Sequence, residues 1–115
     1  MQRRIRIIAG EVEGIGSLND TAAAQKVFDA LPIRSDAQRW GAEVYFRIPV
    51  DAPEEDAQAQ VPSGTLAYWP PGKCFCIFFG QTPASPVNVI GTLDANPKAW
   101  DAVAEGAPIQ IERLD

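Results

Sequence analysis

Two cysteines, Cys74 and Cys76, are the first side chains of this sequence to consider for chemistry. They lie in the stretch LAYWPPGKCFCIFFGQTPAS, over residues 66–85. A closed zinc site normally uses four cysteine or histidine ligands, and the chain has no histidine and no other cysteine. In an extended strand the two Cα atoms lie about 6.5 to 7 Å apart, at or beyond the upper limit of disulfide geometry. We therefore predict that both thiols pack as small apolar groups, with neither a metal nor a cofactor.

The absence of histidine restricts the catalytic chemistry that is open to this chain. It excludes nucleophiles that depend on a histidine base, histidine metal motifs and the commonest general base at neutral pH. The glycine-rich motifs that bind phosphates are also missing. Catalysis would have to use carboxylates, Lys, Arg, Tyr or positioning alone, and the candidates are Arg39, Glu43 and Arg47.

Aromatic side chains indicate a different kind of site, one that binds rather than reacts. Side-chain alternation along CFCIFF, residues 74–79, leaves neither face of this strand polar. One face would fill the interior of a barrel, and the other needs a cover, which could be a helix, a loop, another subunit or a ligand. In the segment WGAEVYF, Glu43 lies between Trp40 and Tyr45, and its pKa would be raised if it lined an apolar groove. A hydrogen-bonded, partly solvated glutamate is the alternative.

The elements that must position these residues are mostly short strands. Alternation and turn-forming residues predict about eight strands: residues 3–9, a glycine-rich partner ending at Gly16, 33–40, 42–49, 65–69, 74–79, 86–93 and 108–114. One helix is expected before Pro32, capped by Asn19, Asp20 or Thr21. A second, short helix is expected to begin at Pro97 and to end at Gly106. Residues 51–60, which are acidic and poor in large apolar groups, predict a solvated loop. The fold class is therefore mainly β, with residues 1–115 forming a single domain.

Charge and hydropathy narrow the possible partners and location. Fifteen acidic and ten basic residues give a net charge of −5, which disfavours nucleic acid as a partner. The cluster of Arg3, Arg4 and Arg6 alternates with isoleucines, as on the solvated face of a strand. No apolar run is long enough to span a membrane, and the N-terminal residues do not resemble an export signal. We therefore expect a cytoplasmic protein.

Four segments in the order LNDTAAAQKVFDALP, WGAEVYFRIP, GTLAYWPPGKCFCIFFGQTPAS and PVNVIG resemble a prokaryotic family of small proteins with a cyclophilin-like fold, first classed as a domain of unknown function. The resemblance extends over about residues 5–93, and YWPPG followed by FFGxTPxS is its specific part. It implies a closed eight-stranded β-barrel capped by two short helices. It also implies a groove on the outside of the barrel, where true cyclophilins bind proline-containing peptides.

The chain departs from the catalytic cyclophilins in two respects. Their prolyl isomerase site sets an arginine among aromatics, a glutamine and a histidine, whereas this chain has no histidine and neither Arg39 nor Arg47 matches that arginine by motif. Related chains often carry a longer insertion within the segment that is TPASPVNV here, so the groove of this chain would be more open.

The main functional hypothesis is a binding module for a proline-containing peptide or a small molecule. Its expected ligand-binding residues are Trp40, Glu43, Tyr45, Tyr68, Trp69, Phe79, Gln81, Thr82 and Asn88. Two alternatives stay open. One is an atypical peptidyl-prolyl isomerase that uses Arg39 or Arg47, and the other is a subunit-interaction domain in a homo- or hetero-oligomer.

Overall fold

The computed structural model describes residues 3–80 and 85–114. The strands are β1 (Arg3–Ala9), β2 (Val12–Leu18), β3 (Ile33–Asp36), β4 (Gln38–Arg39), β5 (Glu43–Arg47), β6 (Thr65–Trp69), β7 (Cys74–Phe78), β8 (Asn88–Leu93) and β9 (Pro108–Arg113). The helices are α1 (Ala22–Asp29) and two 3₁₀ helices, η1 (Pro70–Gly72) and η2 (Pro97–Ala102). The predicted mainly β composition is confirmed. The second predicted helix is present, but with 3₁₀ rather than α geometry.

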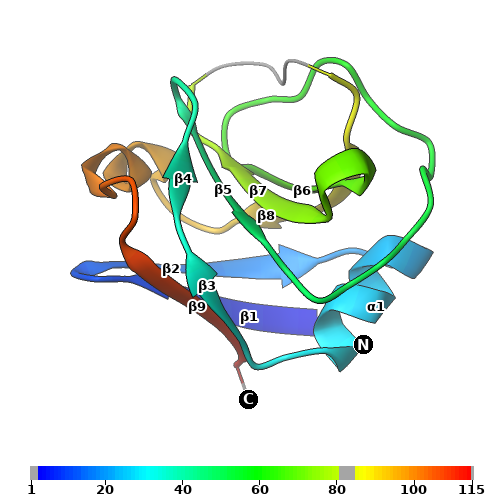
Figure 1. Cartoon of the computed structure of the whole chain (residues 1–115), viewed down its shortest axis with the longest axis horizontal. Coiled ribbons are helices and arrows are strands. Elements are labelled where there is room, and N and C mark those ends of the chain that lie inside the picture. Colours follow the sequence, from blue (N-terminus) through cyan, green and yellow to red (C-terminus); the bar gives the residue numbers. More distant parts are fainter. Residues whose placement is uncertain (1–2, 81–84, 115) are drawn as a thin grey trace.

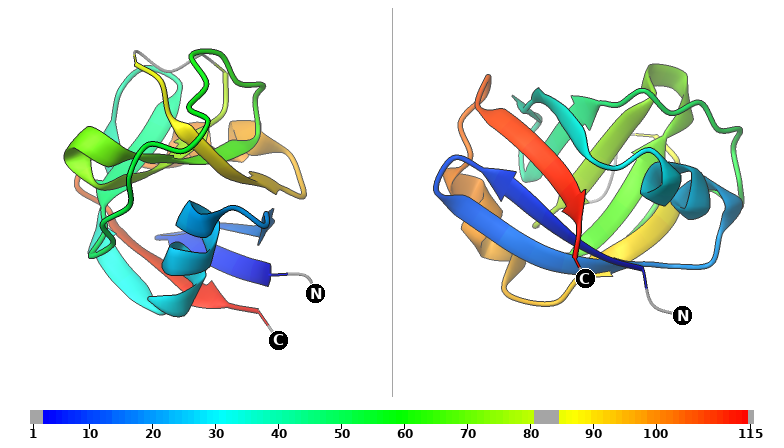
Figure 2. Two further views of the ribbon diagram at one scale, coloured as in Figure 1. Left: turned by 90° about the vertical axis from the view of Figure 1, so that its right-hand side faces the viewer. Right: turned by 90° about the horizontal axis from the view of Figure 1, so that it is seen from below.

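All nine strands belong to one antiparallel sheet in the order β3-β9-β1-β2-β8-β6-β7-β5-β4. The sheet curls into a nearly closed barrel, with α1 and η2 on opposite sides of it in Figure 1. Figure 2 shows the same curl from two further directions. The predicted eight-stranded barrel and the observed nine strands differ only in how one segment is counted.

That segment, residues 33–39, supplies both outermost strands of the sheet. Its first half, β3, pairs with β9, and this pairing continues through Ala37, whose N–H donates to the carbonyl of Ala107 at 2.8 Å. Its second half, β4, then pairs with β5. The change of partner at Ala37 divides one predicted strand into two and brings the two ends of the sheet together.

Two hydrophobic clusters lie on opposite faces of the barrel wall. The inner core fills the barrel and includes Ile5, Ile7, Val44, Phe46, Leu66, Tyr68, Phe75, Ile77, Phe79, Ile90, Trp100 and Ile111. The outer cluster consists of Val61, Ala67, Cys74, Cys76, Phe78 and Val87, with Tyr45, Trp69 and Val89 packed against it. All five residues of β7 are buried, so the prediction that neither face of this strand meets solvent is confirmed.

The cover of the outer face comes from the chain itself. We call residues 50–61 the covering segment; it belongs to the long green connection between β5 and β6 in Figure 1. Residues 51–60, predicted to form a solvated loop, are exposed or half-buried apart from Ala52, and the flanking Val50 and Val61 are buried. Near its end Gln58 forms a two-way backbone bridge with Val87, at 2.8 and 3.0 Å. The sparse apolar residues of this segment therefore complete the two clusters, while its acidic residues remain mostly exposed.

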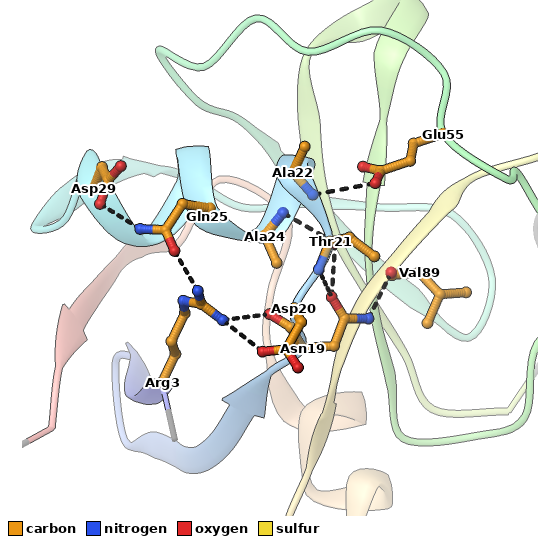
Figure 3. A network of polar contacts seen from close by, with 10 residues as sticks. All are labelled: Arg3, Asn19, Asp20, Thr21, Ala22, Ala24, Gln25, Asp29, Glu55 and Val89. Carbon is orange, nitrogen blue, oxygen red and sulfur yellow. Dashed lines mark hydrogen bonds and ion pairs between the residues drawn. The ribbon is translucent and has the colours of Figure 1, made fainter. Parts of the chain in front are cut away.

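Helix α1 fixes the middle of the covering segment. Of the three predicted caps, Thr21 is the N-cap, and its side chain accepts a hydrogen bond from the Ala24 N–H at 3.2 Å. The carboxylate of Glu55 accepts hydrogen bonds from the N–H groups of Ala22 and Ala23, at 3.1 and 3.0 Å. Figure 3 shows the carboxylate at this helix terminus. A carboxylate at this position accepts hydrogen bonds from free N–H groups and interacts favourably with the helix dipole. These contacts anchor the covering segment to α1.

Candidate functional site

A cavity of about 170 Å³ opens on the outer face of the barrel, beside the outer cluster. Its lining residues are Trp40, Glu43, Tyr45, Trp69, Cys76, Ser85 and Val87. Strand register explains how residues distant in sequence meet here, because Tyr45 of β5 and Ala67 of β6 both lie opposite Cys76 in β7. Alternation then places Glu43 on the same face of β5 as Tyr45.

The aromatic walls of the cavity are held by local contacts. The indole N–H of Trp69 donates to Ser85 Oγ at 2.7 Å, which joins the end of β6 to the segment before β8. The turn PPGK also shapes this wall, since a Cβ at Gly72 would lie 2.4 Å from Trp69 Cζ3. Only a glycine lets the indole ring lie against the turn at this distance. Trp40 exposes 47% of its surface, which is unusual for so large an apolar side chain.

Glu43 is the ionisable group that stands out in the cavity wall. It is only 8% exposed, and this burial raises the pKa of its carboxyl group. The Cys76 side chain forms a hydrogen bond with the carboxyl and opposes part of that increase in pKa. Burial also raises the pKa of the Cys76 thiol well above its ordinary value, so the thiol is protonated at neutral pH and can donate. The raised pKa predicted for Glu43 in an apolar groove is confirmed in direction.

Four of the predicted ligand-binding residues come together at this cavity: Trp40, Glu43, Tyr45 and Trp69. Tyr68 and Asn88 instead make buried contacts within the chain. The Tyr68 hydroxyl donates to the Val50 carbonyl at 2.7 Å, while Asn88 accepts from the Glu55 N–H at 2.8 Å and donates to the Pro53 carbonyl at 3.0 Å. Both residues therefore fasten the covering segment.

Phe79 also lies away from the cavity lining, in the inner core. The guanidinium of Arg39 lies 5.1 Å from the centre of its ring. Gln81 and Thr82, which were predicted to offer polar anchors, lie outside the described residues.

The two candidate catalytic arginines do not line the cavity either. The Arg39 guanidinium donates to the carbonyls of Asp101 and Val103, at 3.0 and 2.8 Å, and forms an ion pair with the Asp101 carboxylate at 3.0 Å. Arg39 therefore holds η2 to the barrel. Arg47 is exposed at the end of β5 and lies opposite Cys74 in the sheet.

Three lining residues were not among the predicted ligand-binding residues: Cys76, Ser85 and Val87. Cys76 was interpreted as a packing group, and it does pack in the outer cluster while also facing the cavity. Its alternation with Phe75 and Ile77 was a signal that it lies on the opposite face of the strand from them, but not that this face is the outer one. The sequence carries no comparable signal for Ser85, because its position depends on the path of the chain before β8.

Two further findings concern the described residues only. Among residues 3–80 and 85–114, no three histidine, cysteine, aspartate or glutamate residues are grouped so that they could hold a metal ion. Within the same ranges, no helix has the length and apolar character needed to cross a membrane.

Comparison with known proteins identifies similar chains. The sequence matches the protein family described as Cyclophilin-like over residues 3–112. The solution structure of the hypothetical protein AF2241 from Archaeoglobus fulgidus is 36% identical, with a TM-score of 0.84, covering 98% of this chain and 95% of that one. The structure of McbB in complex with tryptophan has a TM-score of 0.75 at 12% identity, a likeness of fold alone; it covers 95% of this chain but 44% of McbB. No curated protein matches.

Proposed function

The chain belongs to the cyclophilin-like family, and we propose that it is a binding module whose outer cavity takes a small apolar group of a ligand. That group is a ring or short branched chain, carried by a small molecule or by a peptide residue such as proline. The observation that carries the proposal is the cavity itself, with Trp40, Tyr45 and Trp69 in its walls beside the buried carboxyl of Glu43. Ligand sites are typically concave and apolar with a few placed polar groups.

The size of the cavity supports a small occupant. Ligand pockets commonly enclose about 300 to 1,000 Å³, and this one measures about 170 Å³. It therefore suits one ring or side chain and leaves the remainder of a larger ligand outside. The exposed Trp40 at its edge offers additional contact surface for that remainder.

The rigidity of the walls supports the same conclusion. Trp69 is held by Ser85 and by the turn at Gly72, and the cavity floor consists of three paired strands. A preformed site loses little conformational entropy when a ligand binds.

Prolyl isomerisation and subunit interaction remain predictions from the resemblance. Isomerisation would need a group that polarises the prolyl amide, and the proposed Arg39 and Arg47 lie outside the cavity lining. A protease-coupled assay on X-Pro peptides tests it, and turnover that is lost in Arg39→Ala or Arg47→Ala would replace the binding-module proposal. Sedimentation of the purified protein tests self-association.

The binding proposal is tested by NMR titration with an acetylated proline amide and with 3,3-dimethylbutan-1-ol. We expect shifts of the Tyr45 and Cys76 amides and of the Trp69 indole N–H. The indole of Trp100 serves as an internal reference because it is buried in the inner core. Trp40→Ala should weaken binding, whereas Ile8→Ala, a partly buried apolar residue of β1, should leave it unchanged. Shifts confined to other parts of the surface, or none at millimolar probe, would contradict the proposal.

A further inference from the structure

The chemical character of the cavity walls narrows the class of ligand, on the premise that the cavity is the binding site proposed above. Three of the described lining residues are aromatic, with large ring faces; Trp40 and Tyr45 lie in one hairpin, and Trp69 ends β6. Ring faces carry a negative electrostatic potential and attract cations, more strongly where water is excluded. A carboxyl group among such rings strengthens that preference.

Glu43 has no positively charged partner within the described part of the chain. The ion pairs found there join other carboxylates to Arg or Lys, and Glu43 takes part in none of them. Its side-chain hydrogen bond is with the Cys76 thiol, a weak donor. A buried carboxylate with so little compensation is unfavourable unless a cation joins it.

The carboxylates near the cavity act in the same direction, while Arg47 supplies one opposing positive charge beside Cys74. Burial raises the pKa of the Tyr45 hydroxyl, and the negative charges of Glu43 and Glu105 raise it further. The net charge of the whole chain is −5. An anionic ligand group would be repelled here, whereas a cation would meet complementary charge.

We propose that the cavity recognises an alkylated ammonium group, with the rings of Trp40, Tyr45 and Trp69 around its alkyl substituents and the Glu43 carboxylate facing its charge. Alkylation matters because a bare ammonium ion is strongly hydrated and loses more on entering an apolar site. A nitrogen carrying a few small alkyl groups is also of a size that about 170 Å³ can hold. The group can belong to a free amine or to a methylated lysine of a peptide.

The test compares choline with 3,3-dimethylbutan-1-ol, a neutral molecule of the same shape, by NMR titration at pH 7.5. We expect choline to bind about tenfold more tightly, because attraction to the ring faces and to the Glu43 carboxylate acts on the cation alone. Glu43→Gln should remove most of that difference while leaving the affinity for the alcohol nearly unchanged. Glu54→Gln, which changes an exposed glutamate of the covering segment, is the matched control and should keep the preference.

Tyr45→Leu provides a second variant, because it keeps apolar volume but removes one ring face. It should weaken choline more than the alcohol. Equal affinity for the two probes, or a preference for choline that Glu43→Gln leaves intact, would overturn the ammonium proposal while the apolar binding site stands. If neither probe shifts the cavity residues, both proposals fail. A peptide with trimethyllysine, compared with choline, shows whether a peptide or a free amine is the better ligand.

Discussion

The two faces of β7 are both apolar but are buried in different ways. On the inner face, Phe75 stacks on Phe46 with ring centres 5.3 Å apart, inside a core that the strands of the barrel enclose. On the outer face, Cys76 and Phe78 depend on Val61 and Val87 for cover, and these come from segments between strands. Regular strands can close around an interior completely. Connecting segments cover a surface only in part, and the uncovered part is the cavity.

The largest expected difference between the faces appears when an aromatic ring is removed from each. Phe75→Ala should lower the free energy of unfolding by about 4 to 5 kcal/mol, because the surrounding strands cannot move in to fill the space. Phe78→Ala should cost about 3 kcal/mol, since the covering segment can shift toward the gap. Chemical denaturation of both variants measures the two values. A cost for Phe78→Ala equal to or above that for Phe75→Ala would show that the outer cover is as rigid as the barrel.

Removing the hydroxyl group from one tyrosine on each face should give a smaller difference in the free energy of unfolding. Tyr68→Phe should lower the free energy of unfolding by about 1 to 2 kcal/mol, because the Val50 carbonyl and the Ala52 N–H lose their buried partner. Tyr45→Phe, at the cavity, should change it by less than about 0.5 kcal/mol. Hydrogen exchange should also show faster exchange at Ala52 in Tyr68→Phe alone. Equal destabilisation by the two changes would contradict the expectation that only the Tyr68 hydroxyl stabilises the fold.

The charge state of Glu43 gives a smaller, pH-dependent effect. Burial raises the pKa of Glu43, so protonation of this carboxyl stabilises the folded protein. The contribution is complete below the ordinary glutamate pKa of about 4.3 and is lost as the pH rises through the pKa of the folded state. Cys74, Cys76 and Tyr45, which interact with Glu43, also have raised pKa values and stay neutral in this range. Glu43→Gln should therefore match the parent protein near pH 4 and have a higher Tm at pH 7. Thermal melts across this range test it, and a lower Tm for the variant at pH 7 would contradict it.

The smallest effect on stability is expected at the edge of the cavity. Trp40→Ala should change the free energy of unfolding by less than about 0.5 kcal/mol, because the side chain is about half exposed. The same change should clearly weaken binding of the titration probes. A loss of stability as large as that of Phe78→Ala would identify Trp40 as a structural residue instead.

Much of the fold was predictable because its signals are local. Alternation in RRIRIIA and in CFCIFF predicted the strands and their buried faces, and Thr21 and Pro97 marked the starts of helices. The covering segment was not predictable as a cover. Its burial depends on Val50, Ala52 and Val61, which are too widely spaced to form a periodic pattern within an acidic stretch.

The candidate site was predictable only in part, because residue type does not reveal whether a polar side chain faces a ligand or the rest of the chain. Asn88 and Tyr68 have the chemistry of ligand anchors, yet their hydrogen-bond partners are backbone groups of the covering segment. For Glu43 the nearby Trp40 and Tyr45 suggested an apolar groove, but the sequence left open a partly solvated glutamate, and the burial of the side chain decides between the two. Ser85 was missed because it reaches the cavity only through the tertiary fold.

The two halves of residues 33–39 pair with different strands, and this limits how the barrel could bind a peptide. Many peptide-binding domains add an extended peptide as an extra strand at a free sheet edge, where main-chain hydrogen bonds supply the affinity. Here the outermost strands β3 and β4 are one continuous segment that pairs with β9 on one side and with β5 on the other. The main-chain template for strand addition is limited to the unpaired sides of these two short strands, so the binding module proposed above would rely on side chains that enter a cavity. Such a protein would be selective for individual chemical groups and tolerant of the backbone that carries them.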